Sequence, residues 1–130
     1  MGDYLVAFVE YRPLDVERAE RLWGPGVHAC FAEVQLGEHA PNLLGELAPD
    51  SSLAVPRSSL SPEARKRRDQ QAPELIASDI ISLDADALAR LASGSWVKTR
   101  KGCPRTLSAV LEAVRALGPG ARLAYWFETD

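Results

Sequence analysis

The sequence predicts one α+β or α/β domain, in which helices flank a mixed β-sheet with the N- and C-terminal strands at its centre. Residues 3–11 alternate as a strand that is apolar on both faces, so both faces must be covered. Residues 121–127 show a similar pattern at the other end of the chain. Between them, helical and extended patterns alternate with no repeat and no long linker, which favours a single domain over residues 1–130.

The first half of the chain predicts two helices and a second strand. Residues 14–23 predict a short helix that ends at Gly24–Gly26. Its expected buried face is Leu14, Ala19, Leu22 and Trp23. Residues 27–36 alternate as a strand, and residues 41–48 have helical spacing between two prolines.

Residues 50–73 are interpreted as a surface loop that carries a polar helix. Ser61 is a typical N-cap, and Pro62 suits the first helical position. The helix that follows, to about Gln71, has almost no apolar stripe, so it is expected to be solvated all round. This surface segment is therefore a candidate for mobility.

The second half predicts three further elements and the closing strand. Residues 75–83 have strand character, and Asp84 is expected to cap a helix through residue 92. Residues 95–100 predict a short edge strand, and residues 107–117 predict the longest helix. The closing strand is expected to bury Leu123, Tyr125 and Phe127, with Trp126 on its other face.

Composition places the chain among ordinary globular proteins, with 46% hydrophobic and 25% charged residues. No apolar run approaches the ~20 residues of a membrane helix, and no leader pattern opens the sequence. We therefore expect a cytoplasmic protein with no membrane partner. Two cysteines, Cys30 and Cys103, predict free thiols. The net charge is -3, but residues 1–56 carry nine acids and three bases, whereas residues 57–105 carry ten bases and six acids.

Several short motifs are spread over most of the chain: Val9–Arg12, Asn42–Ala48, Pro56–Arg57, Leu60–Glu63, Ser78–Asp84 and Arg122–Phe127. Together they resemble a group of small uncharacterised bacterial and phage proteins. In that group a strand ends in Glu-x-Arg, a Pro-Arg loop precedes a serine-rich strand and helix, and an aromatic strand closes the chain. This sequence departs from the pattern, with Ser58 and Ser59 where the loop glycine would stand. The resemblance implies the fold and a bacterial or phage origin, and it transfers no catalytic residue.

The segment before the long helix is a candidate anion site. Its binding candidates are Lys98, Arg100, Lys101, Arg105 and Thr106. Basic side chains that lead into a helix N-terminus can hold a phosphate or carboxylate. Cys103 would stand at the N-cap, where the helix dipole and these cations favour a thiolate. Cys103 is thus a weak catalytic candidate, and a half-buried turn residue is the more ordinary interpretation.

Two other groups of residues are weaker candidates for a binding site. Arg65–Arg68 could contact nucleic acid together with residues 98–105, but the acidic balance of the chain makes a solvated helix face more ordinary. His28, His39, Cys30 and Cys103 lack the paired spacing of a metal site, so no metal or other cofactor is predicted.

The ends of the two central strands give a third candidate binding site. Glu10, Arg12, Trp126 and Glu128 converge if the first and last strands are neighbours. Trp126 requires a cover, either from another element of this chain or from another chain.

The hypothesis that these observations favour is a small non-enzymatic binding protein, for instance an immunity-type or phage-type inhibitor. Its expected partner is another protein or a second copy of itself, as a homodimer. The alternative is a small enzyme or an anion- or nucleotide-binding protein that uses loop 98–106 with Cys103. A nucleic-acid binder is the weaker alternative.

Overall fold

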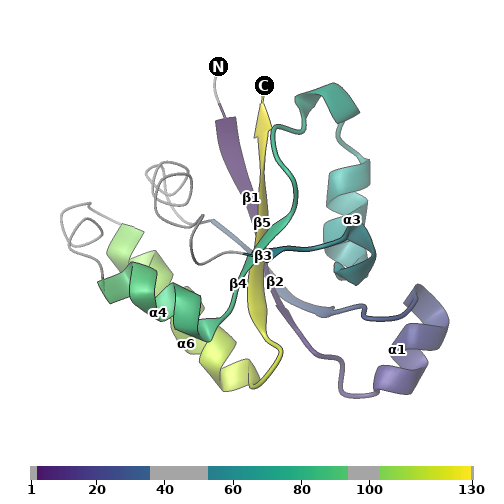
Figure 1. The fold of residues 1–130 in the computed structure, drawn as a ribbon, viewed down its shortest axis with the longest axis horizontal. Helices are drawn as coiled ribbons and strands as arrows, with labels where there is room; N and C mark the ends of the chain where they lie inside the picture. The colour runs from purple at the N-terminus through teal and green to yellow at the C-terminus, as the bar shows by residue number, and fades with distance from the viewer. Residues whose placement is uncertain (1–2, 36–52, 94–102, 130) are drawn as a thin grey trace.

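A computed structural model describes residues 3–35, 53–93 and 103–129. Its strands are β1 (Asp3–Tyr11), β2 (Ala29–Val34), β3 (Leu53–Ala54), β4 (Ile81–Leu83) and β5 (Arg122–Thr129). They form one sheet in the order β2-β1-β5-β4-β3, so the two terminal strands are central, as the sequence predicted (Figure 1). Every strand pairing that the structure describes is antiparallel rather than mixed, which makes the domain α+β.

Helices cover both faces of this sheet (Figure 1). They are α1 (Val16–Trp23), α3 (Pro62–Asp69), α4 (Ala85–Ser93) and α6 (Cys103–Leu117), with 3-10 turns at Arg57–Ser59 and Pro73–Leu75. Helices α4 and α6 lie on one side of the sheet, and α3 lies on the other (Figure 1). Helix α1 lies beyond the lower end of the sheet, on the same side as α3 (Figure 1).

The helix starts follow side-chain chemistry that the sequence contains. The Oγ of Ser61 accepts the backbone N–H of Ala64, and the Oδ1 of Asp84 accepts that of Ala87. The Oδ1 of Asp15 does the same for Arg18. Each of these caps satisfies an N–H that the helix itself leaves without a partner. The two caps predicted from sequence, at Ser61 and Asp84, are confirmed.

Alternation along β1 and β5 builds two cores, one on each face of the sheet. On the α4–α6 side, Val9, Leu123 and Tyr125 pack with Leu88 and Leu107. On the α3 side, the buried residues are Val6, Phe8, Leu60, Ala64, Ile80, Ala124 and Trp126. The rings of Phe8 and Trp126 stack there with centroids 5.9 Å apart. The double-sided apolar pattern of the central strands is therefore explained by helices on both faces.

The polar helix is not the fully solvated excursion that the sequence predicted. Ala64 on α3 is fully buried against the sheet, and Leu60, just before the helix, is also fully buried. The helix reaches the sheet through arginine side chains rather than through an apolar stripe. Long arginine side chains can do this because an apolar stem carries the charged group to a partner.

Two other expectations differ from the structure. Helix α1 begins at Val16 and buries only Ala19 among the four residues predicted for its inner face. In residues 75–83, only Ile81–Leu83 forms a strand, and Ile76 makes an isolated bridge to Glu128. Pro73, which has no N–H, opens a 3-10 turn just before it. The helix predicted at residues 41–48 and the strand predicted at residues 95–100 lie outside the described residues.

No helix in the described parts of the chain is both long enough and apolar enough to cross a membrane.

Candidate functional site

Two glutamates are fully buried on the face of the sheet that α3 covers. Glu10 comes from β1 and Glu128 from β5, and both have no exposed surface. Because an ionised carboxylate loses its hydration on burial, it stays in a folded protein only where donors and cations replace the water. The residues around these two groups therefore decide what this face can do.

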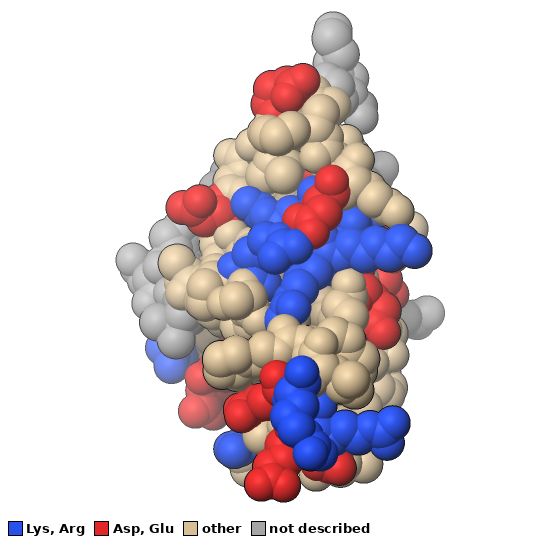
Figure 2. Space-filling view, turned by 90° about the vertical axis from the view of Figure 1, so that its right-hand side faces the viewer, with Lys and Arg blue, Asp and Glu red and all other residues tan. Residues whose placement is uncertain are grey.

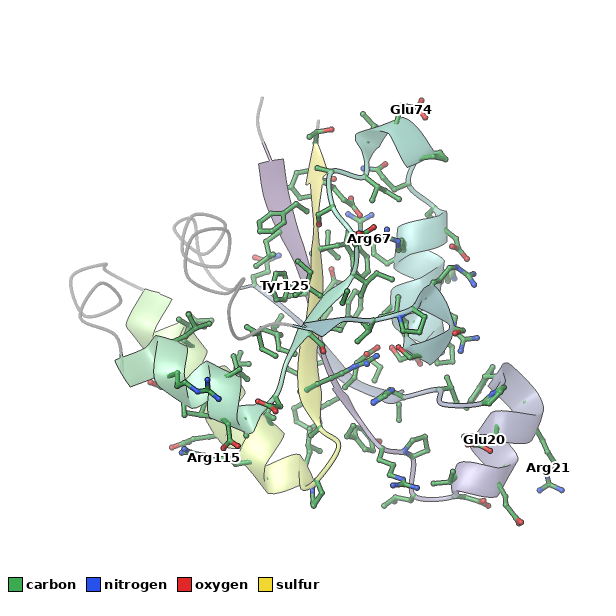
Figure 3. All side chains as sticks on the ribbon, in the orientation of Figure 1. Glu20, Arg21, Arg67, Glu74, Arg115 and Tyr125 are labelled. Atoms are coloured by element: carbon green, nitrogen blue, oxygen red, sulfur yellow. The ribbon has the colours of Figure 1, made fainter. Side chains whose placement is uncertain are left out.

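Glu128 receives four side-chain hydrogen bonds. Its Oε1 accepts from Tyr4 Oη at 3.0 Å, Arg67 Nη2 at 2.9 Å and Gln71 Nε2 at 3.0 Å. Its Oε2 accepts from the indole Nε1 of Trp126 at 2.7 Å. Figure 3 shows Arg67 reaching from α3 towards the sheet. The carboxylate is thus the point at which α3 is fixed to the C-terminal strand.

Glu10 is satisfied in the same way at the other end of this face. Its Oε2 accepts the backbone N–H of Ser61 at 2.7 Å, and its Oε1 accepts from Arg122 Nε at 3.2 Å and Nη2 at 3.0 Å. Arg122 also donates to the carbonyl and the hydroxyl of Ser59. Glu10 therefore binds the residue that caps α3 and the first residue of β5 at once.

His28 joins the same network through Ser59. The carbonyl of Ser59 lies 2.9 Å from His28 Nδ1 and also accepts the backbone N–H of His28 at 3.0 Å. Because a carbonyl only accepts, Nδ1 carries the proton. Burial lowers the pKa of His28, and the nearby Arg122 lowers it further. His28 is therefore neutral at pH 7 and serves as a structural donor.

The remaining arginines of this segment are also engaged with the fold. Arg65 donates to the carbonyls of Leu60 at 3.0 Å and Trp23 at 2.9 Å, and to that of Ser58. The Arg68 guanidinium lies 5.3 Å from the ring centroid of Trp126, a cation–π contact. Arg57 pairs with Asp69, and this hydrogen bond lowers the pKa of the Asp69 carboxyl. Lys66, in contrast, is exposed.

Large apolar side chains are exposed on α1 and just before its N-cap, Asp15. Leu14 is 99% exposed, Leu22 is 59% exposed and Trp23 is 48% exposed. The bond from Arg65 to the Trp23 carbonyl joins the end of α1 directly to α3. We call this surface the α1–α3 face, which consists of Leu14, Leu22, Trp23, Arg57, Arg65, Lys66, Arg67 and Arg68.

Figure 2 views the molecule from this side. Basic side chains gather across the middle of the view, where α3 lies, and a second group of mixed sign gathers at the lower end, where α1 lies (Figure 2). Uncharged surface separates the two groups. The face therefore places the basic side chains of α3 beside uncharged surface, on a helix that the buried carboxylates fix to the sheet.

Two hollows lie outside this face. One is lined by residues that include Arg12, Glu20 and His28, and the other lies between β2 and α6, against Phe31 and Thr106. Phe31 is the fourth large apolar side chain that is well exposed in the described residues, at 57%. It is on the α6 side of the sheet and does not belong to the α1–α3 face.

Glu10, Trp126 and Glu128 lie on one face of the sheet, as the sequence predicted. All three side chains are buried inside the protein. Trp126 has no exposed surface, so the cover it required is α3 of the same chain. Arg12, predicted beside them, is exposed at the hollow near His28. Glu10, Trp126 and Glu128 thus position the α1–α3 face rather than contact a partner.

Most of the basic loop before the long helix lies outside the described residues: Lys98, Arg100 and Lys101, and the side chains of Cys103 and Arg105. Helix α6 begins at Cys103, so Cys103 is its first residue and not the N-cap that the sequence predicted. Thr106 is partly buried and lines the hollow beside Phe31.

Of the metal candidates, His39 and the side chain of Cys103 lie outside the described residues. In residues 3–35, 53–93 and 103–129, no three His, Cys, Asp or Glu residues are placed to share an ion. Burial raises the pKa of the Cys30 thiol, and the carboxylate of Glu63 raises it further. Cys30 is therefore a protonated thiol at neutral pH, which is neither a good nucleophile nor a ready metal ligand.

Sequence reasoning singled out Arg65–Arg68 of this face but missed its apolar residues. Leu22 and Trp23 were assigned to a buried side because apolar residues at helical spacing usually pack inward. The available signal was charge: Glu17, Arg18, Glu20 and Arg21 occupy half of this eight-residue helix. Such a short helix presents little apolar surface for burial, so its largest side chains remain in contact with solvent.

No protein-family model, curated protein or solved structure matches the chain. The resemblance to small bacterial and phage proteins therefore stays a prediction.

Proposed function

We propose that this protein is a small non-enzymatic binding protein that recognises another protein through its α1–α3 face. The observation that carries the proposal is the exposure of Leu22 and Trp23 on the short helix α1, with Leu14 also exposed just before it. Tryptophan and arginine are the residues that most often dominate the energy of protein interfaces. Arg65 bonds to the backbone carbonyl of Trp23, so residues of both types belong to this surface.

The second support is that the face is held in place before any partner arrives. Arg67 and Gln71 are bound by Glu128, and the backbone of Ser61 is bound by Glu10. A surface that is already ordered loses less conformational entropy on binding than a flexible one. This arrangement suits a protein that acts by presenting a surface, as an immunity-type or phage-type inhibitor does.

The basic loop with Cys103 remains the alternative site, for an anion-binding protein or a small enzyme. The described residues provide no geometry for it. A nucleic-acid binder is less well supported, because Arg57, Arg65, Arg67 and Arg68 already make contacts within the fold. Bidentate phosphate contacts need free N–H donors, and these side chains use several of theirs internally.

Site-specific photocrosslinking in the producing cells tests the proposal. A photoreactive phenylalanine analogue replaces Leu22 on α1 in one variant and Glu112, an exposed residue of α6, in the control. We expect a discrete crosslinked species from position 22 and none of the same mass from position 112. Crosslinks of equal yield from both positions, or none from position 22, would contradict the proposal.

A further inference from the structure

The basic part of the α1–α3 face keeps positive charge after its internal pairs are counted. Arg57 is neutralised by Asp69, and Arg67 by the buried Glu128. Within the described residues, no carboxylate lies at ion-pair distance from Arg65, Lys66 or Arg68. Arg65 and Arg68 bond to backbone carbonyls, which satisfy N–H groups and leave the charge in place. The exposed Glu63 on the same helix offsets one of these three cations, so α3 keeps a smaller net positive charge.

These cations adjoin the exposed apolar side chains. Arg65 donates to the Trp23 carbonyl at 2.9 Å, so the last turn of α1 and the first turn of α3 share one surface. The acidic residues of α1, Glu17 and Glu20, are exposed on the helix itself. The face is thus apolar and of mixed charge at its α1 end, where Arg18 and Arg21 accompany these acids, and basic at its α3 end.

We infer that the partner is an acidic protein segment with at least one large apolar side chain. The inference rests on the proposed function and names the chemistry of its partner. The apolar side chain would pack on Leu22 and Trp23, and the carboxylates would lie towards Lys66 and Arg68. Glu17 and Glu20 stand on α1 beside Arg18 and Arg21, so the charges of α1 balance, and the excess of cations on α3 decides where the carboxylates of the partner lie.

Charge and composition favour this partner over two others. A second copy of the chain in a two-fold contact centred on α3 would bring two basic helices together, which would leave Lys66 and Arg68 without carboxylate partners. A nucleic acid would use the basic residues but would leave Leu14 and Leu22 without a role. An acidic segment with an apolar anchor is the occupant that matches both parts of the face.

The test uses the full chain and a random peptide library displayed on phage, selected on the immobilised protein. We expect the selected peptides to be rich in Asp and Glu and to share a Leu, Phe or Trp position. Lys66→Glu should weaken a selected peptide about tenfold, because it reverses a charge next to the anchor. Arg115→Glu, on exposed α6 surface, is the matched control and should leave the affinity unchanged (Figure 3).

The variants also separate this inference from the proposed function. Leu22→Ser should abolish peptide binding in either case, because it removes the apolar anchor. Selected peptides without acidic enrichment, or an affinity that Lys66→Glu does not change, would overturn the acidic partner while the binding face stands. Retention of peptide binding by Leu22→Ser would overturn both. If the protein binds a fluorescent oligonucleotide tightly and Lys66→Glu loses that binding, the face belongs to a nucleic acid instead. If the protein is a dimer and Leu22→Ser is not, the face belongs to a second copy of the chain.

Discussion

The indole of Trp126 donates to the carboxylate of Glu128 at 2.7 Å, within one strand and on one face of the sheet. Both side chains have no exposed surface. Residues two apart in a strand point to the same side, so this bond lies between the sheet and α3. Arg67 reaches the same carboxylate and Arg68 lies over the same indole, which couples α3 to the sheet through polar as well as apolar contacts.

Replacing Glu128 should strongly destabilise the fold. In Glu128→Gln, one carboxylate oxygen becomes an NH2 group, which would face the Trp126 indole N–H even if the remaining oxygen still accepted from Tyr4, Arg67 and Gln71. Arg67 would also lose its counterion. We expect the free energy of unfolding to fall by about 3 kcal/mol, as for the loss of one partner of a buried ion pair. Urea unfolding followed by circular dichroism measures it.

Asp69→Asn is the matched control for that variant. It breaks the Arg57–Asp69 pair, whose side chains are 52% and 48% exposed. Exposed pairs contribute less than about 1 kcal/mol, so the loss should be small. If the free energy of unfolding fell equally in the Glu128 and Asp69 variants, burial would not determine how much these ion pairs contribute to stability.

The Glu10–Arg122 pair should behave as a coupled unit. Glu10→Leu alone leaves the buried Arg122 without its counterion, which should cost about 3 kcal/mol. The double variant Glu10→Leu with Arg122→Met removes both charges and should be more stable than Glu10→Leu. A double-mutant cycle should give a coupling free energy above about 1 kcal/mol. Strict additivity of the two single variants would refute the coupling.

Stability should fall on mild acidification because of His28. Its pKa is lowered in the folded protein, first by burial and then by Arg122, so the unfolded chain binds the proton more tightly. Stability is therefore full above the unfolded pKa of 6.5 and is lost as the pH falls below it. His28→Gln should lose less stability than the wild type between about pH 7.5 and about pH 5.5. Identical pH dependence in the two proteins would rule out His28 as the source.

Tyr125→Phe should stabilise the protein. The Tyr125 side chain lies in the core on the opposite side of β5 from α3 (Figure 3), and its hydroxyl has no hydrogen-bond partner among the described residues. Burial raises its pKa to about 12. Removing a buried donor without a partner should raise the free energy of unfolding by about 1 kcal/mol. A lower melting temperature for Tyr125→Phe would indicate that the hydroxyl is bonded in the native protein.

Sequence reasoning predicted the centre of the fold because local pattern determines it. β1 and β5 are apolar on both faces, and a strand of this kind has to be central and covered on both sides. The caps at Ser61 and Asp84 were equally local. The role of α3 was not predictable in this way, because Arg67 appears solvated until Glu128 is placed beside it, 61 residues further along the chain.

The candidate site was harder to predict for a related reason. Apolar residues at helical spacing predict a buried face, but they do not say whether the chain has an element to cover it. The sheet covers Trp126 with α3, whereas α1 leaves Leu22 and Trp23 in contact with solvent. Only the arrangement of the elements separates the buried tryptophan from the exposed one.

Native mass spectrometry of protein purified gently from its producing cells tests the central claim most directly. The wild type is compared with a Leu14→Ser, Leu22→Ser variant, which alters only exposed side chains and should unfold within about 0.5 kcal/mol of the wild type. We expect the wild type to carry a bound protein and the equally folded variant to carry none. A wild type and a variant that carry the same partner in equal amount, or a wild type that is itself bare, would contradict it.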